Sequence, residues 1–579
     1  MTGLDRADVA ARAREVVGGL LTRPGGEVSP SVYETGRMVA LAPWLSGHRE
    51  RVAYLTSTQG TDGTWGPHAR YALVPTLSAA DGLLAELGPE RRAEAGYGDR
   101  PDAETVAFAV RRALRALWRL GDASSPCGDG ALPDTPAIEL IVPALVISIN
   151  QRLHQLGPPG VAPLPLPDGA DGTRLAAVRA RLLSGKPVPE KLLHALEVAG
   201  DAATRAPGVR PTPAGVIGAS PAATAAWLGE AGHADEGAEG AAWAFLDEVV
   251  AAHGGPVPCG VPITVFERGW ALSWLVRAGI SVVVPEELGL SLLGAAEPGG
   301  VAAGAGLPAD ADTTSVALYA LALLGSPRAP ESLWDYHVGP YFCTWRGEDG
   351  VSTTVNAHVL DAFGQYVAVC PQARPRYGAV MAGLAEWLAG RQDEVGSWSD
   401  RWHASPYYAT ACCALALGAF GGEASDAAVR RAVRWVLETQ RADGSWGLWR
   451  GTAEETAYAM HLLLLAGRPG DTAGESLAAA ARGYAYLMRT EREIGVKSNG
   501  RETWEVFPPM WHDKDLYLPR TIVQAVVTAA LHLAQREPVI TAWYQARARN
   551  GHTAAHNGAT DQGRTELTRH LYKNHSRLS

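Results

Sequence analysis

Hydrophobic residues gather in segments of helical length along most of the chain. Short loops rich in Gly, Pro and Asp separate these segments, and the alternation of a half-buried strand is scarce, with residues 280–284 the one good candidate. The helical segments are residues 106–120, 138–149, 223–228, 241–250, 269–276, 377–388, 427–437, 455–466 and 521–534. So many apolar helices in succession predict an all-α protein built from layered helical barrels or solenoids.

A spaced motif, Gln-x-x-x-Gly-x-Trp, occurs three times, and each copy follows a predicted helix. The copies are Gln59/Gly63/Trp65, Gln392/Gly396/Trp398 and Gln440/Gly444/Trp446. The Gly permits a turn, the Gln amide can bond free backbone groups at a helix end, and the Trp can pack on that end. We therefore expect these motifs to tether neighbouring helices, as in other internal repeats, and not to catalyse a reaction.

Two aspartates, Asp310 and Asp312, stand where another helix begins. Thr313 suits the start of that helix and Gly325 its end, and residues 316–324 have no polar face, which predicts a buried helix. The pKa of a carboxyl group at such a site is under two opposing influences. Low dielectric and a like charge raise it, whereas the helix N-terminus lowers it. A carboxyl group balanced in this way would suit the protonation of an alkene. The alternative, which these residues leave open, is that both aspartates cap the helix on a surface turn.

Composition and charge narrow the class of protein. The 579 residues are 47% hydrophobic and 19% charged, as in a globular chain of two or three domains. A net charge of −10 argues against a general nucleic-acid-binding surface. The six cysteines lack zinc-site spacing, which favours a reducing cytoplasm, and the charged residues 1–21 predict an amphipathic helix, not a signal peptide or membrane anchor. The sequence does not predict an oligomeric state.

The Gln-Trp repeats and the Asp-x-Asp-Thr-Thr stretch together resemble the class II terpene cyclases, which protonate an isoprenoid alkene and do not ionise a diphosphate. Further blocks resemble the family's motifs in the same order and cover roughly residues 29 to 530. These blocks are residues 29–36, 138–145, 192–197, 220–225, 261–270, 352–361 and 402–410.

One position inside the acid motif departs from much of the family. Copalyl-type and squalene-hopene cyclases have Asp-x-Asp-Asp, whereas Thr313 stands at the fourth position here. In this respect the chain resembles drimenyl diphosphate synthases, which implies farnesyl diphosphate as the substrate and drimenyl diphosphate as the product. The alternative is a labdane-type diterpene cyclase that makes a copalyl diphosphate from geranylgeranyl diphosphate. The alternative of another class is a non-catalytic α-barrel that binds a lipid.

The resemblance also implies an architecture of two α/α-barrels, called β and γ in this family, with the active site between them. Residues 1–40 and 264–540 would form the β domain, and residues 41–263 the inserted γ domain. Residues 541–579 are polar and rich in His and Arg, so we expect a flexible or loosely docked tail.

The family pattern assigns roles to the acid motif and its neighbours. Asp312, the middle acid, would be the general acid, with Asp310 beside it and Thr313 as a hydroxyl partner. Asn356 occupies the position whose amide hydrogen-bonds the acid, and its alternative role is to cap the helix around residue 359.

The carbocation formed by protonation has to be shielded from water and stabilised by aromatic faces. Trp270, Trp345 and Tyr407 lie in or near the matched blocks, and we expect them to face the cation. Plain core packing is the alternative for each of the three.

The diphosphate group is expected to survive the reaction. The chain contains no Asp-Asp dipeptide and therefore no Asp-Asp-x-x-Asp metal cluster of the class I type. The resemblance implies Mg²⁺ bound to the diphosphate, with Glu139 and Asp134 as its acidic partners. It also implies cationic partners for the phosphates, Lys186 and Lys514, although lone lysines are usually solvated surface groups.

The base that would end the reaction is His194 or a substitute for it. In plant copalyl enzymes a His pairs with an Asn; His194 matches the His, but Pro258, Cys259 and Gly260 stand where the Asn is expected. Three possibilities stay open: His194 acts alone, a bound water acts, or His194 is a satisfied core histidine.

Overall fold

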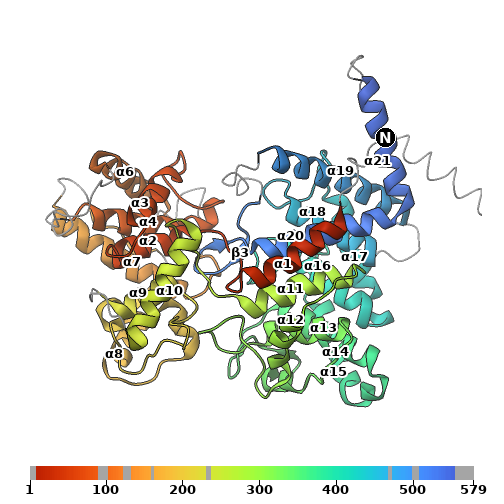
Figure 1. Cartoon of the computed structure of the whole chain (residues 1–579), viewed down its shortest axis with the longest axis horizontal. Coiled ribbons are helices and arrows are strands. Elements are labelled where there is room, and N and C mark those ends of the chain that lie inside the picture. The colour runs from red at the N-terminus through yellow and green to blue at the C-terminus, as the bar shows by residue number, and fades with distance from the viewer. Residues whose placement is uncertain are drawn as a thin grey trace, which may run out of the picture.

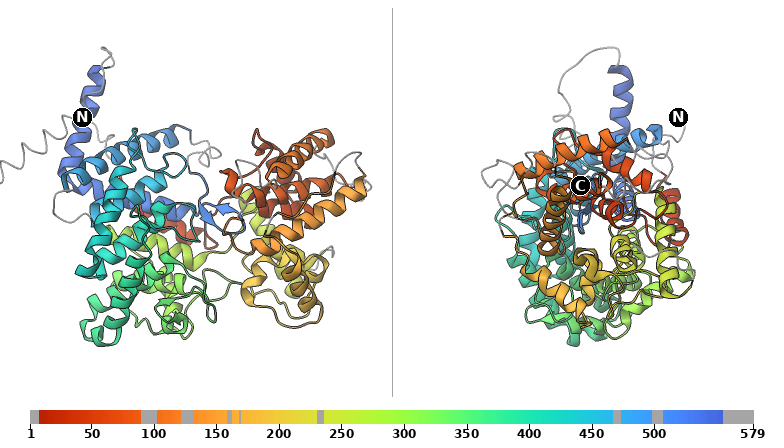
Figure 2. Two further views of the ribbon diagram at one scale, coloured as in Figure 1. Left: turned by 180° about the vertical axis from the view of Figure 1, so that it is seen from behind. Right: turned by 90° about the vertical axis from the view of Figure 1, so that its left-hand side faces the viewer.

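Two lobes of helices make up the protein (Figures 1 and 2). The computed structural model describes residues 8–88, 102–120, 132–157, 162–167, 169–229, 236–466, 473–497 and 507–554. The all-α prediction is confirmed, and the two lobes are α/α-barrel domains. The one predicted strand is wrong, because residues 280–284 form an irregular segment.

The larger lobe contains the first helix and the described helices from α11 onward. Its helices are α1 (Val9–Thr22), α11 (Thr264–Arg277), α12 (Glu286–Leu292), α13 (Ala311–Leu323), α14 (Thr353–Val369), α15 (Arg374–Gly390), α16 (Pro406–Phe420), α17 (Asp426–Glu438), α18 (Ala453–His461), α19 (Ala473–Lys497), α20 (Arg520–Arg536) and α21 (Pro538–Ala554). Two short hairpins, β1 (His337–Val338) with β2 (Tyr341–Phe342) and β3 (Trp511–His512) with β4 (Leu516–Tyr517), are antiparallel. One continuous apolar core runs through this lobe, from Val9 to Tyr544.

The smaller lobe lies between α1 and α11 in the sequence. Its helices are α2 (Val32–Leu41), α3 (His48–Ser57), α4 (Leu73–Glu86), α6 (Ala103–Leu120), α7 (Ile138–Leu156), α8 (Thr173–Leu183), α9 (Pro221–Leu228) and α10 (Gly237–His253), with a 3₁₀ segment at Glu190–Ala203. Two apolar clusters, separate from that of the larger lobe, form its interior.

The three Gln-Trp motifs tether neighbouring helices as predicted. In the middle copy, Trp398 Nε1 donates to the carbonyl of Leu388 in α15 at 2.8 Å, and Gln392 Nε2 donates to the carbonyl of Ala428 in α17 at 2.9 Å. Gly396 has φ +99, and a Cβ there would lie 2.7 Å from the carbonyl oxygen of Arg431, so the loop needs glycine. The other two copies repeat these bonds.

The chain passes from the larger lobe to the smaller one after α1, and it returns to the larger lobe after α10. Helix α1 packs on α11 and α20 of the larger lobe, whereas α2 packs on α4 and α9 of the smaller one. The segment 1–40, which the sequence assigns to one domain, is therefore divided. Tyr33 and Val39 of α2 belong to an apolar cluster of the smaller lobe, and this burial fixes the helix there.

The hairpin of β3 and β4 joins the lobes (Figures 1 and 2). Asp515 of its turn accepts hydrogen bonds from Ser31 Oγ at 2.7 Å and from the amide of Tyr33 at 3.0 Å. Lys514 Nζ lies 2.8 Å from Glu34 and 3.1 Å from Glu197, both in the smaller lobe, and all three side chains are fully buried. The hairpin is therefore anchored in the smaller lobe while its flanking segments belong to the larger.

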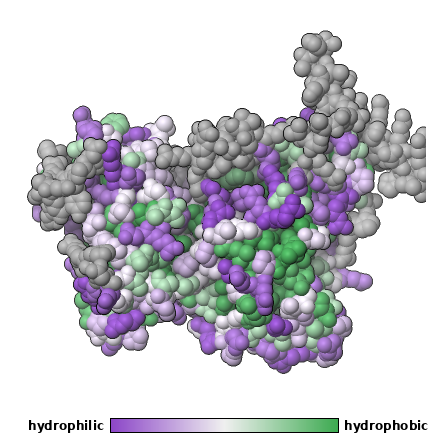
Figure 3. Space-filling model, viewed as in Figure 1, coloured by the Kyte–Doolittle hydropathy of each residue, from purple (hydrophilic) through white to green (hydrophobic). Residues whose placement is uncertain are grey.

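Helix α21 extends into the expected polar tail. Ile540 and Tyr544 pack into the larger core, so the first part of the tail is docked, and residues 555–579 lie outside the described part of the chain. On the face seen in Figure 3, hydrophobic side chains gather over the larger lobe. Within the described ranges, no helix has both the length and the apolar character that crossing a membrane requires.

Candidate active site

A cavity of about 340 Å³ lies between the lobes, and both contribute to its walls. The larger lobe supplies Phe266, Asp310, Asp312, Thr313, Trp345, Arg401, Trp402, Tyr408, Trp511, His512, Asp513 and Tyr517. The smaller lobe supplies Asp134, Glu139, Lys191, Leu192 and His194. Both aspartates of the acid motif thus face a chamber and do not sit on a surface turn.

Asp310 is the N-cap of α13 and is also buried. Its Oδ1 accepts a hydrogen bond from the amide of Thr313 at 2.6 Å, and its Oδ2 accepts one from Thr313 Oγ1 at 2.9 Å. Burial, together with the smaller effect of the Asp312 charge, raises the pKa of Asp310 to about 7 against the effect of these hydrogen bonds. Thr313 is a hydroxyl partner as expected, but of Asp310 and not of Asp312.

Asp312 lies in the first turn of α13 and is held by His358 of α14. The distance from His358 Nδ1 to Asp312 Oδ1 is 2.6 Å. Burial lowers the pKa of His358, but the charge of Asp312 and this hydrogen bond outweigh it and raise the pKa to about 10. The charge of an ionised Asp312 therefore favours the imidazolium form of His358, and the imidazolium in turn favours the anion that Asp312 becomes when it gives up a proton.

The expected contact between Asn356 and the acid is wrong. Asn356 Oδ1 accepts from the amide of Phe342 at 2.8 Å, and its Nδ2 donates to the carbonyls of Phe342 and Ser352 at 3.0 and 2.7 Å. Asn356 and His358 are two positions apart on α14, so they project in nearly opposite directions. The side chain that bonds the acid is that of His358, which lies in the same matched block, two residues after Asn356.

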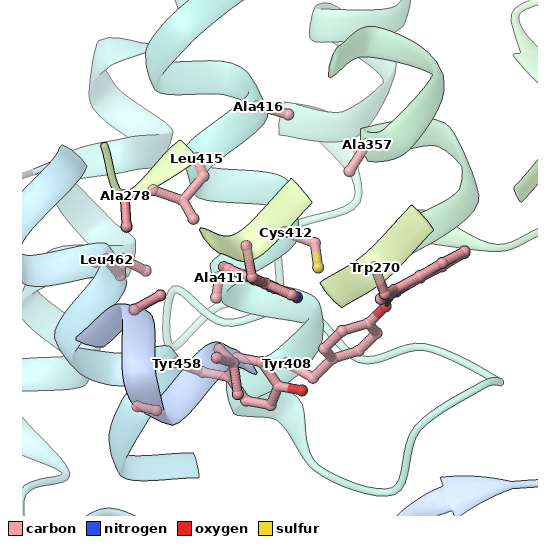
Figure 4. Packing of buried hydrophobic residues seen from close by; sticks show 14 of the residues in the cluster. Trp270, Ala278, Ala357, Tyr408, Ala411, Cys412, Leu415, Ala416, Tyr458 and Leu462 are labelled. Carbon is pink, nitrogen blue, oxygen red and sulfur yellow. Dashed lines mark hydrogen bonds between the residues drawn. The ribbon is translucent and has the colours of Figure 1, made fainter. Parts of the chain in front are cut away.

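Aromatic rings form much of the cavity wall next to the acids. Trp345 lines it as predicted and meets Trp402 edge to face, with ring centroids 5.4 Å apart. Tyr408 lines it and packs at 4.7 Å against Trp511. Trp270 does not reach the lining; it stands behind Tyr408 and donates from Nε1 to the phenol oxygen at 2.9 Å (Figure 4). Its role is to fix the orientation of Tyr408.

Tyr407 is a core residue, and the prediction that it faces the cation is wrong. Its ring packs on Trp435 of α17, with centroids 4.6 Å apart, and it is absent from the cavity lining. Adjacent residues of a helix project about 100° apart. Since Tyr408 faces the cavity, Tyr407 faces the neighbouring helix.

The two lysines predicted to bind phosphate do not line this cavity. Lys186 is exposed beside a separate groove along α8, and Lys514 is enclosed by Glu34 and Glu197. The cations that do line it are Lys191, whose Nζ lies 5.3 Å above the ring of Trp345, and Arg401. Lys191 directly precedes the Leu-Leu-His block, and this position beside a matched block is the feature of the sequence that could have identified it.

His194 lines the cavity and has an unexpected partner, Asp513. Its Nδ1 lies 2.5 Å from the carbonyl of Gly218 and its Nε2 lies 2.6 Å from Asp513 Oδ1. Burial disfavours the charge, but Asp513 and these bonds raise the pKa of His194. Burial likewise acts against the charge of Asp513, yet His194 and Lys514 lower its pKa to about 2. The two form an ion pair, so His194 alone is not a free base.

Comparisons with known proteins agree with this geometry. Residues 348–519 match the family model described as the squalene-hopene cyclase C-terminal domain. The chain is 42% identical over 530 residues to the ent-copalyl diphosphate synthase of Streptomyces sp. (strain KO-3988), covering 92% of this chain and 97% of that one. The chain belongs to the class II terpene cyclases.

Two further class II cyclases resemble it along most of their length. The labda-7,13-dienyl diphosphate synthase of Streptomyces clavuligerus is 40% identical over 531 residues, covering 89% of this chain and 91% of that one. The solved structure of ent-copalyl diphosphate synthase from Streptomyces platensis superposes with a TM-score of 0.82 and 42% identity, covering 91% of this chain and 99% of that chain.

The carboxylates at the cavity rim fit a magnesium ion of the kind the cyclase family implies. Asp134 and Glu139 both line the cavity, with side chains 65% and 44% exposed, and pair loosely with Arg401 at 3.2 Å and Arg174 at 3.4 Å. In the parts of the chain that the structure describes, no group of three His, Cys, Asp or Glu residues is placed to hold a metal alone. One or two carboxylates that share the ion with phosphate oxygens are a common arrangement for Mg²⁺.

Proposed function

We propose that this cyclase converts geranylgeranyl diphosphate into a bicyclic, copalyl-type diphosphate and retains the diphosphate group. The observation that carries the proposal is the Asp312–His358 pair at the wall of an aromatic cavity, together with relatives named copalyl and labdadienyl diphosphate synthases. Farnesyl diphosphate, the first expectation from the sequence, is less well supported. Thr313, on which that expectation rested, bonds to Asp310 and has no evident relation to the length of the substrate.

Asp312 is the proton donor in this proposal. One of its oxygens is held by His358, so the acidic proton is carried by the other, and the side chain lines the cavity. Transfer of this proton to the terminal alkene leaves a carboxylate beside an imidazolium, which is a stable ion pair. The π-electrons of successive alkenes then close two rings, and loss of a proton from a carbon beside the final cation makes the overall reaction an isomerisation.

The aromatic wall serves the cations between these two proton transfers. Trp345, Trp402 and Tyr408 can turn π-faces toward positive charge, which each face stabilises by about 0.5–2 kcal/mol. Phe266 and Leu192 help to exclude water from the same chamber, since water would trap the cation as an alcohol.

The diphosphate end of the substrate fits the rim of the cavity at the smaller lobe. Lys191 and Arg401 supply positive charge there, and Asp134 and Glu139 could share a magnesium ion with the phosphate oxygens. Bound there, Mg²⁺ would neutralise part of the diphosphate charge. These groups orient the chain so that its terminal alkene lies against Asp312.

The proton acceptor that ends the reaction is Asp513, oriented by His194. Asp513 lines the cavity as a carboxylate, and its low pKa is no obstacle because a C–H bond next to a carbocation is a far stronger acid than a carboxylic acid. His194 holds the carboxylate in place before the proton arrives.

Incubation of the purified protein and Mg²⁺ with geranylgeranyl or farnesyl diphosphate, separately, tests the proposal. Products are dephosphorylated and analysed by gas chromatography and mass spectrometry, with the reaction also run in deuterated water. We expect a bicyclic C20 alcohol carrying one deuterium. A bicyclic product from farnesyl diphosphate alone would restore the drimenyl interpretation, and the absence of any cyclised product would favour the non-catalytic alternative.

A further inference from the structure

A second, much smaller cavity lies behind the acid. It encloses about 20 Å³ and is bordered by α11, α13, α14 and α16. His358 lines this cavity and not the large one, whereas Asp312 lines the large one and not this. His358 therefore separates the two chambers. Figure 4 shows this region, with Cys412 of α16 and Trp270 of α11, both of which border the small cavity.

Asp361 provides an unsatisfied acceptor in the small cavity. Its side chain is 2% exposed and its Oδ2 accepts a hydrogen bond from Arg277, which in turn donates from Nε to Tyr319 at 2.7 Å. Asp361 Oδ1 is buried and has no hydrogen-bond partner among the residues that the structure describes. A buried carboxylate oxygen in this state is costly, and such atoms are usually satisfied by an ordered water.

The same helix brings His358 and Asp361 to one face. They are three positions apart on α14, a spacing at which side chains are neighbours, and the charge of each affects the other. Nδ1 of His358 is bound to Asp312, and on the side of the small cavity His358 also bonds the thiol of Cys412. As an imidazolium, His358 has a proton on Nε2, for which a thiol is only a weak acceptor.

The small cavity suits one water molecule. Its volume exceeds the roughly 10–15 Å³ that a single water requires, and a stable buried water needs two to four polar partners. His358 Nε2 is a donor, Asp361 Oδ1 an acceptor, and the hydroxyl of Ser273 lines the same space.

We propose that a water bound in this cavity links His358 Nε2 to Asp361 Oδ1, and that Asp361 is a positioning residue which keeps His358 charged beside the acid. The ion pair with Arg277 fixes the position of the Asp361 carboxylate. The water bonds both this carboxylate and His358, and His358 in turn holds Asp312. The inference rests on the proposed function, since it takes Asp312 as the proton donor. Asp361 touches no substrate, so its effect should appear in kcat and not in KM.

The pH profile of kcat should report this role. The titratable and charged groups around His358 are Asp312 and Tyr319 of α13, Asp361 of α14, Arg277 of α11, and Cys412 and Tyr408 of α16. Replacing Asp361 by neutral Asn removes a negative charge on the side away from substrate. His358 then loses its proton more readily, and the basic limb of the profile moves to lower pH.

The test compares Asp361→Asn and Val316→Ile with the wild type. Val316 lines the small cavity, and one added methylene group would displace the water while leaving the Asp361–Arg277 pair intact. We expect the basic limb of kcat to move down by about one pH unit in both variants, a tenfold change in the apparent acid constant, with KM unchanged. A wild-type crystal structure should show the water, and the Val316→Ile structure should lack it.

A control separates this role from a purely structural one. Asp400 also supports α14, since its Oδ1 accepts from the amide of Thr353 at 2.7 Å, but it does not border the small cavity. Asp400→Asn should lower the Tm and leave the basic limb in place. If the Val316→Ile variant folds and has the wild-type pH profile of kcat, the inference fails. This outcome is decisive even if Asp361→Asn is unstable. A wild type inactive on both diphosphates would instead overturn the proposed function.

Discussion

His194 and Asp513 are 319 positions apart in the sequence, yet their side chains meet at 2.6 Å on the cavity wall. His194 comes from the smaller lobe and Asp513 from the hairpin that joins the lobes. Neither neighbouring sequence reveals the pair, because it depends on how the hairpin enters the smaller lobe. The pair lines the same chamber as Asp312, so proton donor and proton acceptor can act on one bound chain.

Asp513→Asn should change how the reaction ends. The amide cannot accept the proton, so the last cation persists until water or another group quenches it, and we expect a lower kcat with alcohols or isomeric alkenes among the products. Mass spectrometry of the dephosphorylated products provides the measurement. Asp515→Asn is the matched control on the same turn, because Asp515 bonds Ser31 and Tyr33 and does not line the cavity. Equal product ratios in both variants would contradict the assignment.

Asp312→Asn should abolish cyclisation while leaving the protein folded. Loss of the general acid is expected to lower kcat by at least about 10³-fold, since no other group replaces the proton donor. Asp310→Asn should cost less activity, because Asn is also a good N-cap and the donor remains. Deuterium incorporation and Tm are measured for both. The roles are reversed if Asp310→Asn proves the more damaging change.

Asp310 should also make stability depend on pH. Its pKa is about 7 in the folded protein, mainly through burial, and near its ordinary value of 3.8 when unfolded. Between about pH 4 and 7 the unfolded state releases this proton and the folded state keeps it, so raising the pH favours unfolding. The free energy of unfolding, measured by urea titration, should therefore fall from pH 5 to pH 7 in the wild type. It should fall less in Asp310→Asn.

Tyr408 and Tyr407 form a natural pair of test and control. Tyr408→Leu removes a π-face from the cavity and should lower kcat roughly tenfold, in line with about 1–2 kcal/mol for a cation-π contact. Tyr407→Leu removes a ring that packs on Trp435 and should affect Tm more than products. Steady-state kinetics and product profiles distinguish them, and identical effects of the two changes would argue against a role for Tyr408 toward the cation.

Lys514→Met should weaken the junction of the lobes. Two carboxylates, Glu34 and Glu197, would be left fully buried with no positive partner, at a cost of about 3–5 kcal/mol. Denaturant unfolding should show a lower midpoint. Adding Glu34→Gln and Glu197→Gln to the same variant should restore part of the loss. If the triple variant were less stable than Lys514→Met, the buried charges would not be the cause.

Local features of the site could be predicted from sequence, and contacts between elements could not. The start of α13 at Asp310 and the turn of the Gln392–Trp398 motif, where Gln392 Nε2 donates to the carbonyl of Gly396, depend on residues within a few positions of each other, so the pattern contains them. The assignments of Asn356 and Tyr407 failed for a different reason. Helices α14 and α16 are buried almost all round, so no polar face indicates which side meets the cavity.

Lys514 shows the same limit for charged residues. A lysine in a polar turn predicts exposure or an anionic ligand, and its burial depends on two glutamates that are distant in sequence. Asp134 and Glu139 were placed at the cavity by resemblance to the family's blocks, without any local signal of their own.

The turn between β3 and β4 places three consecutive charged residues, Asp513, Lys514 and Asp515, against the smaller lobe. Chimeras that exchange barrels between related cyclases should therefore transfer residues 511–517 together with the inserted barrel. A swap made at the chain crossings alone would pair the recipient's turn with the donor's counterparts of Glu34 and Glu197. Recombination boundaries in this scaffold are set by that turn and not by the linkers.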